Sequence, residues 1–145
     1  MAVLAYDEQG RLLLIQDKPS GLWGFPGGII DPLEQPADAA VRETWEEAGV
    51  LVELTKLIGV FAGNDFSTSY ENGDQVSCVA TVFSARFICG TPRPDGVETA
   101  DARFFSPQEI DNLPCLPHFL VIHKATSQSA KQAYFMPSSW KPQNV

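Results

Sequence analysis

Short apolar segments separated by turn residues predict that the chain begins with a hairpin. Residues 2–6 and 12–15 are apolar and flank the polar sequence Asp-Glu-Gln-Gly, a pattern typical of two strands joined by a turn. Residues 18–32 are dense in Gly and Pro, so we expect little regular structure there beyond a short extended piece at 24–25. The hairpin should therefore lead into a long loop.

A helix is predicted from about Pro36 to Gly49, because Pro is favoured in the first helical turn and Gly just beyond the last. Successive residues of a helix are rotated by about 100°, so the segment can be divided into two faces. One face is expected to pack in the core, and it consists of Ala37, Val41, Trp45 and Ala48. The opposite face is acidic and consists of Glu43, Glu46 and Glu47.

The middle of the chain predicts two long strands. Residues 50–61 and 75–88 are rich in β-branched and aromatic side chains, and the sequence Asn-Gly-Asp at 72–74 supplies a turn before the second strand. A turn rich in Pro and Gly at 90–96 then leads to a short final strand at 102–105.

The last part of the chain predicts two helices and a tail. Ser106 and Glu109 form a capping box with Pro107 in the first helical position, and a second helix is expected over 117–127. The tail beyond residue 133 has no clear period and is expected to be loosely held. Strands mixed with a few helices, without strict βαβ alternation, indicate an α+β fold in which a mixed sheet lies between helices.

Length and composition narrow the range of functions. At 145 residues the chain has the usual size of one domain, so we expect residues 1–145 to form a single domain. The net charge of −8 argues against stable nucleic-acid binding, which needs Lys and Arg at the phosphates. Three cysteines without metal-site spacing, and a sequence without a signal-peptide or membrane-spanning pattern, lead us to expect a cytoplasmic protein that does not bind membranes.

The acidic helix face is the main candidate for chemistry. Like charges three or four positions apart destabilise a helix by roughly 0.2–0.5 kcal/mol per pair, so another interaction should offset their repulsion. A hard divalent cation is the natural candidate, because Mg²⁺ binds carboxylate oxygens together with substrate phosphates and water. A solvated acidic face is the alternative, and for an isolated Glu-Glu pair it would be the better explanation.

The surroundings of this helix in the sequence favour the metal site. The run Gly28-x5-Glu34-x7-Arg42-Glu43-Thr44-x-Glu46-Glu47-x-Gly49-Val50 resembles the Nudix box. The loop from Trp23 to Gly28 is similar to the one that precedes the box in that family. The resemblance covers most of the chain, weakens after Ser106 and is to MutT-like and ADP-ribose pyrophosphatase-like members. It implies a Nudix-type α/β/α sandwich. Thr44 departs from the family pattern, which has a bulky aliphatic residue there, and we expect only a modest change in packing.

The resemblance also implies roles for residues of the box. Glu46 and Glu47 would bind Mg²⁺, or alternatively Mn²⁺, together with the backbone carbonyl of Gly28. Glu43 would be a further metal ligand or would position the attacking water. Arg42 would take part in catalysis by orienting the helix through charge-assisted hydrogen bonds.

Further residues are assigned supporting or catalytic roles by the same resemblance. Glu34 and Gly27 would support the site. Hydrolysis needs a general base, which could be Glu43 or a carboxylate from another loop. Glu98 lies where several Nudix members carry a catalytic glutamate, although a solvated turn residue explains it equally well.

Three aromatic residues, Trp23, Phe66 and Tyr70, are candidates for stacking on a base or ribose, although aromatic side chains in such positions more often pack in the core. The implied substrate is a nucleotide, and the implied reaction is hydrolysis of the phosphoanhydride bond of a nucleoside diphosphate linked to another moiety, such as ADP-ribose or a nucleotide sugar. The alternatives are a MutT-like nucleoside triphosphate pyrophosphohydrolase and a non-catalytic nucleotide-binding module. Homodimers are common in the family, so a homodimer is a further expectation.

Overall fold

A mixed β-sheet forms the centre of the computed structural model, which describes residues 1–69, 72–128, 132–135 and 138. Five strands of this six-stranded sheet lie in the order β3-β2-β1-β7-β4, and β8 pairs with β2. β1 and β7 are parallel, whereas the other paired strands are antiparallel. The strands are β1 (Ala2–Tyr6), β2 (Leu12–Asp17), β3 (Trp23–Gly24), β4 (Val50–Phe61), β7 (Ala80–Gly90) and β8 (Thr99–Phe105).

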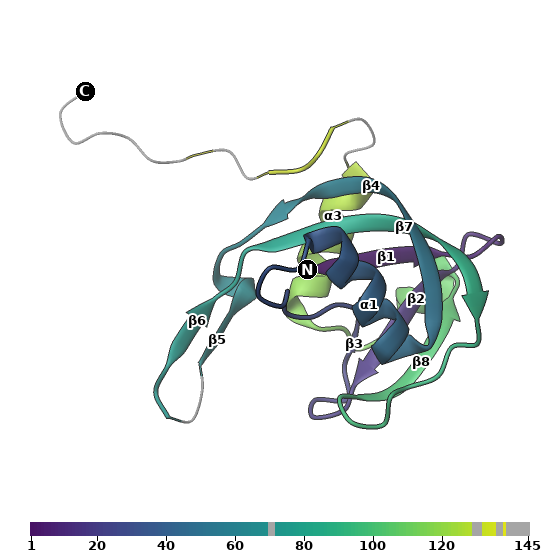
Figure 1. The fold of residues 1–145 in the computed structure, drawn as a ribbon, viewed down its shortest axis with the longest axis horizontal. Helices are drawn as coiled ribbons and strands as arrows, with labels where there is room; N and C mark the ends of the chain where they lie inside the picture. The colour runs from purple at the N-terminus through teal and green to yellow at the C-terminus, as the bar shows by residue number, and fades with distance from the viewer. Residues whose placement is uncertain (70–71, 129–131, 136–137, 139–145) are drawn as a thin grey trace.

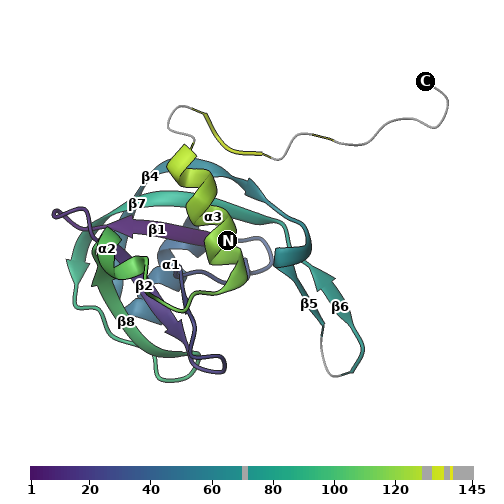
Figure 2. The ribbon, with the colours of Figure 1, turned by 180° about the vertical axis from the view of Figure 1, so that it is seen from behind.

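Helices cover both faces of the sheet. α1 (Pro36–Ala48) lies on one face, whereas α2 (Pro107–Ile110) and α3 (Pro117–Gln128) lie on the other, as the two opposite views show (Figures 1 and 2). The layers are therefore those of an α+β Nudix-type sandwich with a mixed sheet, as predicted. Among the described residues, no helix combines the length and the apolar character needed to cross a lipid bilayer.

The two layers of core are built from alternate residues of the same strands. In β1, Val3 belongs to the core cluster on the α1 side, and Leu4 belongs to the cluster that contains Phe119 of α3. Both residues are almost completely buried. Because both faces of the central strands are covered, these strands are continuous apolar runs and not alternating ones.

The predicted second long strand is in fact two strands in different sheets. β6 (Gln75–Ser77) pairs with β5 (Ser67–Ser69), which follows the short helix η1 (Asn64–Phe66), and this hairpin projects from the body of the molecule (Figure 1). The Cys78 N–H donates to the Phe66 carbonyl, 2.9 Å away, at the base of the hairpin. After this hairpin the chain returns to the main sheet only at β7. The prediction of one strand over 75–88 is therefore wrong.

The buried side of α1 also differs from the prediction. Trp45 is 46% exposed and Ala37 is exposed, whereas Thr44 is fully buried and Glu47 is 7% exposed. The Thr44 hydroxyl donates to the Ala40 carbonyl one turn earlier, at 2.7 Å, which satisfies its buried polar group. Small side chains on the sheet-facing side let the helix approach closely, and the large indole is left outside.

The ends of the helices follow the predicted local chemistry. α1 begins at Pro36 and ends at Gly49, which adopts a left-handed conformation (φ 66°) and donates its N–H to the Trp45 carbonyl. The capping box of α2 is present, because the Glu109 carboxylate accepts the N–H of Ser106 at 2.7 Å.

The tail is held more firmly than expected where it is described. Tyr134 forms a parallel bridge with Gly59 of β4. The expectation that the chain beyond residue 133 would be loosely held is therefore wrong for Tyr134.

Candidate active site

Two consecutive glycines bring the backbone against the acidic side of α1. The Gly27 N–H donates to Glu47 Oε2 at 2.7 Å. A Cβ atom on Gly28 would lie 2.5 Å from Glu43 Oε1, so a larger residue could not occupy this position without displacing that carboxylate. The Gly28 carbonyl accepts a hydrogen bond of 2.7 Å from the Met1 backbone nitrogen, which uses one of its two lone pairs.

Arg42 connects the carboxylates of the site. Its Nε and Nη2 atoms each donate to Glu34 at 2.8 Å, a bidentate pair. Its Nη1 atom lies 3.0 Å from Glu43 Oε1 and 3.0 Å from Glu46 Oε2. The hydrogen bonds from Arg42 lower the pKa of Glu34 to about 2. The pKa of Arg42 is raised in turn, most by Glu34 and then by Glu46 and Glu43. One guanidinium thus fixes three acidic side chains along one edge of the site.

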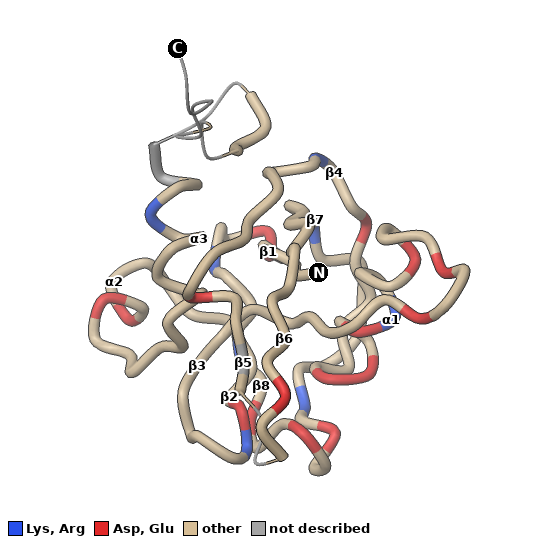
Figure 3. The backbone as a smooth tube through the Cα atoms, turned by 90° about the vertical axis from the view of Figure 1, so that its left-hand side faces the viewer, with Lys and Arg blue, Asp and Glu red and all other residues tan. Residues whose placement is uncertain are grey.

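Glu47 is the carboxylate with the least compensation. Its pKa is raised to about 8, chiefly by burial and in addition by the nearby charges of Glu43, Glu98 and Asp95, against the single hydrogen bond from Gly27. Burial also raises the pKa of Glu43, although contact with Arg42 opposes this effect. Figure 3 shows the acidic positions that gather along α1 and the loops beside it.

The donor set fits a divalent cation in its chemistry. Among the described residues, no group of three or more Asp, Glu, His or Cys side chains is already arranged to hold a metal ion. The hydrogen bonds explain this arrangement, since Glu43 and Glu46 accept from Arg42 and Glu47 accepts from Gly27. A cation between these oxygens would offset the burial and mutual repulsion that now disfavour ionisation of Glu43 and Glu47.

The loop before β8 brings a further carboxylate to this cluster. Burial opposes ionisation of Asp95, but the N–H groups of Thr99, Glu98 and Val97 lower its pKa to about 2. The Thr99 hydroxyl is buried and lies 3.0 Å from the Glu47 carbonyl. This loop therefore places Glu98, which is exposed, close enough to influence Glu43 and Glu47.

Asp95 and Thr99 were not identified from the sequence. The Asp-Gly pair at 95–96 indicates a turn, and Asp95 does cap it. Nothing local indicates that the same turn packs against the end of α1, because that contact joins residues 52 positions apart.

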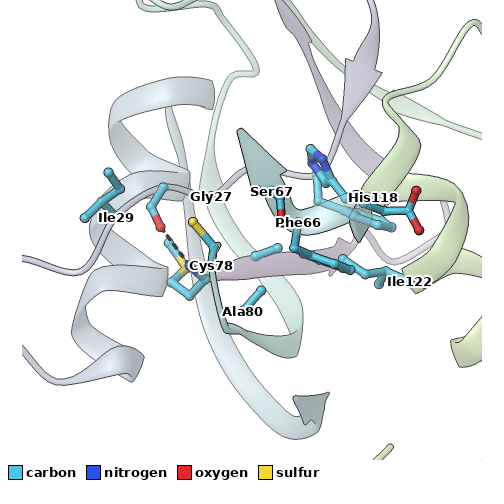
Figure 4. Close-up of a pocket in the computed structure, with 13 residues that line it drawn as sticks. Gly27, Ile29, Phe66, Ser67, Cys78, Ala80, His118 and Ile122 are labelled. Atoms are coloured by element: carbon cyan, nitrogen blue, oxygen red, sulfur yellow. Dashed lines mark hydrogen bonds between the residues drawn. The ribbon is translucent and has the colours of Figure 1, made fainter. Parts of the chain in front are cut away.

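A cavity of about 260 Å³ lies beside the glycines. Phe66 and His118 lie on one side of it, and Gly27 and Ile29 lie on the other (Figure 4). Burial lowers the pKa of His118, with Asp17 and Asp65 acting in the opposite direction. The full lining consists of Met1, Ala2, Phe25, Gly27, Gly28, Ile29, Asp65, Phe66, Ser67, Cys78, Ala80, His118 and Ile122.

The three aromatic candidates have different positions. Phe66 lines the cavity. Trp23 is only 4% exposed and packs edge to face on Phe105 in the core, with ring centroids 4.7 Å apart. The expectation that Trp23 binds substrate is therefore wrong for this structure, since packing leaves its ring no accessible face. Tyr70 lies outside the described residues.

Comparison with known proteins shows the family to which this chain belongs. A model of the NUDIX domain family matches residues 1–124. A MutT-like protein of Streptomyces ambofaciens is 35% identical over 103 residues, which cover 71% of this chain and 60% of that protein. A putative 8-oxo-dGTP diphosphatase of Bacillus subtilis is 33% identical over 119 residues, which cover 82% of this chain and 69% of that protein.

A solved structure extends the comparison to the fold. An ADP-ribose pyrophosphatase from Streptococcus suis has a TM-score of 0.63 and 25% identity over 92% of each chain. The chain belongs to the Nudix hydrolase family. Its similar proteins include MutT-like and ADP-ribose pyrophosphatase-like members.

Proposed function

We propose that this chain is a divalent-metal-dependent hydrolase that cleaves the phosphoanhydride bond of a nucleoside diphosphate linked to another moiety, such as ADP-ribose or a nucleotide sugar. One observation carries the proposal. The cavity beside Gly27 and Gly28 lies next to the carboxylates of Glu43 and Glu47, whose pKa values are both raised by burial. A nucleoside could occupy the cavity while its diphosphate lies at the carboxylates.

The carboxylate end would hold the metal. Glu43, Glu46, Glu47 and the Gly28 carbonyl are the proposed ligands of Mg²⁺ or Mn²⁺, which when bound would neutralise charge on the phosphate oxygens. Arg42 holds the carboxylates of Glu43 and Glu46 in place. Glu34 and the backbone of Gly27 would support this arrangement, through their hydrogen bonds to Arg42 and Glu47.

Hydrolysis requires that a water proton be accepted as the water oxygen bonds to phosphorus and the anhydride P–O bond breaks. Glu98 is the proposed base, because Glu43 is already engaged by Arg42 whereas Glu98 is exposed at the edge of the cluster. Glu43 is the alternative base.

The cavity would hold the nucleobase of the substrate. Among the described residues, its lining contains no Lys or Arg side chain, and it combines apolar side chains with Phe66, His118 and Asp65. Because the pKa of His118 is lowered by burial, its ring is predominantly neutral at pH 7 and offers one hydrogen-bond donor and one acceptor. This composition suits a planar, uncharged nucleobase that can stack on Phe66 better than it suits a further phosphate.

A nucleoside triphosphate pyrophosphohydrolase is the second candidate. The 33% identity with a putative 8-oxo-dGTP diphosphatase favours it, and the same carboxylates would serve that reaction. A non-catalytic nucleotide-binding module is less well supported, because the four box glutamates are all retained. The products distinguish the two reactions, since only the second releases pyrophosphate.

The test is a product analysis with a matched control. Wild type, Glu47→Gln and Glu53→Gln are incubated with Mg²⁺ and with ADP-ribose, nucleotide sugars, dinucleoside polyphosphates and nucleoside triphosphates, and the products are separated by chromatography. Glu53 is exposed and pairs with Arg86 across β4 and β7, so its variant should behave like wild type. Cleavage that Glu47→Gln abolishes would support the proposal. Nucleotide binding without turnover by wild type would replace it with the binding module. Light scattering of the same samples tests the expected homodimer.

A further inference from the structure

A short segment near the end of the described chain is joined to the edge of the main sheet, although it lies beyond the residues that match the Nudix family. The Tyr134 N–H donates to the Ile58 carbonyl at 2.7 Å, and the Val60 N–H donates to the Tyr134 carbonyl at 3.0 Å. These bonds flank Gly59 on β4, the last strand in the sheet order. The segment therefore pairs with backbone groups that an edge strand otherwise leaves open.

The sheet edge is shaped to receive this segment. A Cβ atom on Gly59 would lie 2.4 Å from the Tyr134 carbonyl oxygen, so the approach requires glycine. The Tyr134 ring stacks on Phe61, with centroids 4.7 Å apart and planes 17° apart. Phe61 is almost fully buried, whereas the neighbouring Phe135 is 72% exposed. Tyr134 is thus the anchor of the segment.

Aromatic contacts continue from this anchor to the cavity. The Phe61 and Phe66 ring centroids are 6.2 Å apart, and those of Phe66 and His118 are 6.1 Å apart. Phe66 and His118 form one side of the cavity (Figure 4). A continuous series of aromatic rings therefore joins Tyr134 to the cavity wall.

We propose that Tyr134 is a positioning residue for substrate binding, which holds Phe66 in the cavity wall by stacking on Phe61. The proposal rests on the proposed function, because it takes the Phe66 side of the cavity as the base site. Phe66 lies across the cavity from Gly27 and hence from the α1 carboxylates (Figure 4). Loss of the Tyr134 contact should therefore weaken substrate binding and leave the chemical step intact.

Two variants disrupt the contact in different ways. Tyr134→Ala removes the ring, and Gly59→Ala displaces the segment without changing its sequence. Each should raise KM about threefold to tenfold, the range expected for one aromatic pair, with kcat little changed. Tyr134→Phe and Phe135→Ala are the matched controls, since the first keeps the ring and the second changes an exposed neighbour, and both should behave like wild type. Loss of folded protein would lower the apparent kcat and leave KM unchanged, so misfolding can be distinguished from loss of the Tyr134 contact.

Amide hydrogen exchange provides a readout that does not depend on catalysis. Both disruptive variants should speed exchange at Val60, because its acceptor is the backbone carbonyl of residue 134 and moves away when the segment is no longer anchored. Exchange should also be faster at Phe66 and Cys78, whose N–H groups are bonded at the base of the β5–β6 hairpin. Faster exchange at Val60 alone, with KM unchanged, would overturn the proposal. So would a Tyr134→Phe variant as impaired as Tyr134→Ala. If wild type cleaves no nucleotide, the proposed function fails, and exchange at Phe66 and Cys78 still decides whether Tyr134 orders the cavity wall.

Discussion

Glu47→Gln should make the metal-free protein more stable at neutral pH, even though it removes a residue proposed to be essential. In the folded chain, burial is the main cause that raises the pKa of Glu47 from its ordinary 4.5 to about 8. A group whose pKa is raised on folding contributes its full stability below the unfolded value and loses it as the pH rises through the folded value. The free energy of unfolding of the metal-free wild type should therefore fall between about pH 4.5 and pH 8.

The size of this effect follows from the shift. One pKa unit corresponds to about 1.4 kcal/mol, so the raised pKa of Glu47 should lower the free energy of unfolding by about 3 kcal/mol at pH 7 relative to pH 4.5. Gln cannot ionise, and its amide oxygen can still accept the Gly27 N–H that Glu47 accepts at 2.7 Å. At pH 7 the variant should accordingly be more stable than wild type by a free energy of this order.

The assay is urea unfolding in the presence of a chelator, followed by Trp fluorescence at several pH values from 5 to 8.5. The difference between wild type and Glu47→Gln isolates this residue from other titrating groups, and Glu8→Gln on the exposed β1–β2 turn serves as the control. Added Mg²⁺ should stabilise wild type by mass action and should have little effect on the variant. Equal pH dependence of wild type and Glu47→Gln would refute the reasoning, because Glu47 would then not be a buried, uncompensated carboxylate.

The remaining predictions concern the supports of the site. Arg42→Lys cannot bond both oxygens of Glu34 and should reduce kcat/KM by roughly 10- to 100-fold. Wild-type kinetics would contradict the role of Arg42 in holding the acidic side chains of the site. Gly28→Ala should increase the Mg²⁺ concentration needed for half-maximal activity by roughly tenfold or more, because the added Cβ would meet Glu43 at 2.5 Å; an unchanged metal dependence would argue against this contact. Thr44→Val should change the free energy of unfolding by about 1 kcal/mol or less, whereas Thr44→Leu should lose about 1–3 kcal/mol by overpacking a fully buried position. Equal thermal stability of the two Thr44 variants would show that this position has room to spare.

Local chemistry made several parts of the molecule predictable. The ends of α1 depend on Pro36 and Gly49 and on bonds within one turn, and the capping box of α2 depends on Ser106 and Glu109. The spacing of the box likewise placed the carboxylates on one helix. The contact of Arg42 with acidic side chains is within reach of sequence reasoning, because those partners lie on the same helix or just before it.

The face of α1 that is buried was not predictable in the same way. Trp45 has the largest side chain of the helix, yet it is exposed, whereas the acidic residue Glu47 is buried. Close packing on the sheet selects small side chains, and Thr44 fits there because its hydroxyl bonds to the helix backbone. Hydrophobicity alone does not include this constraint of size.

The sequence by itself predicted the class of fold, the position of the box helix and the acidic residues on that helix, because each depends on local pattern, on neighbours within a few positions or on the resemblance to the Nudix box. Only the tertiary structure decided that Trp23 packs in the core, that the Asp95 turn meets the end of α1, and that Tyr134 pairs with the edge of β4. These contacts join residues far apart in the chain. Their energies arise from packing and from hydrogen bonds that exist only once the sheet has formed.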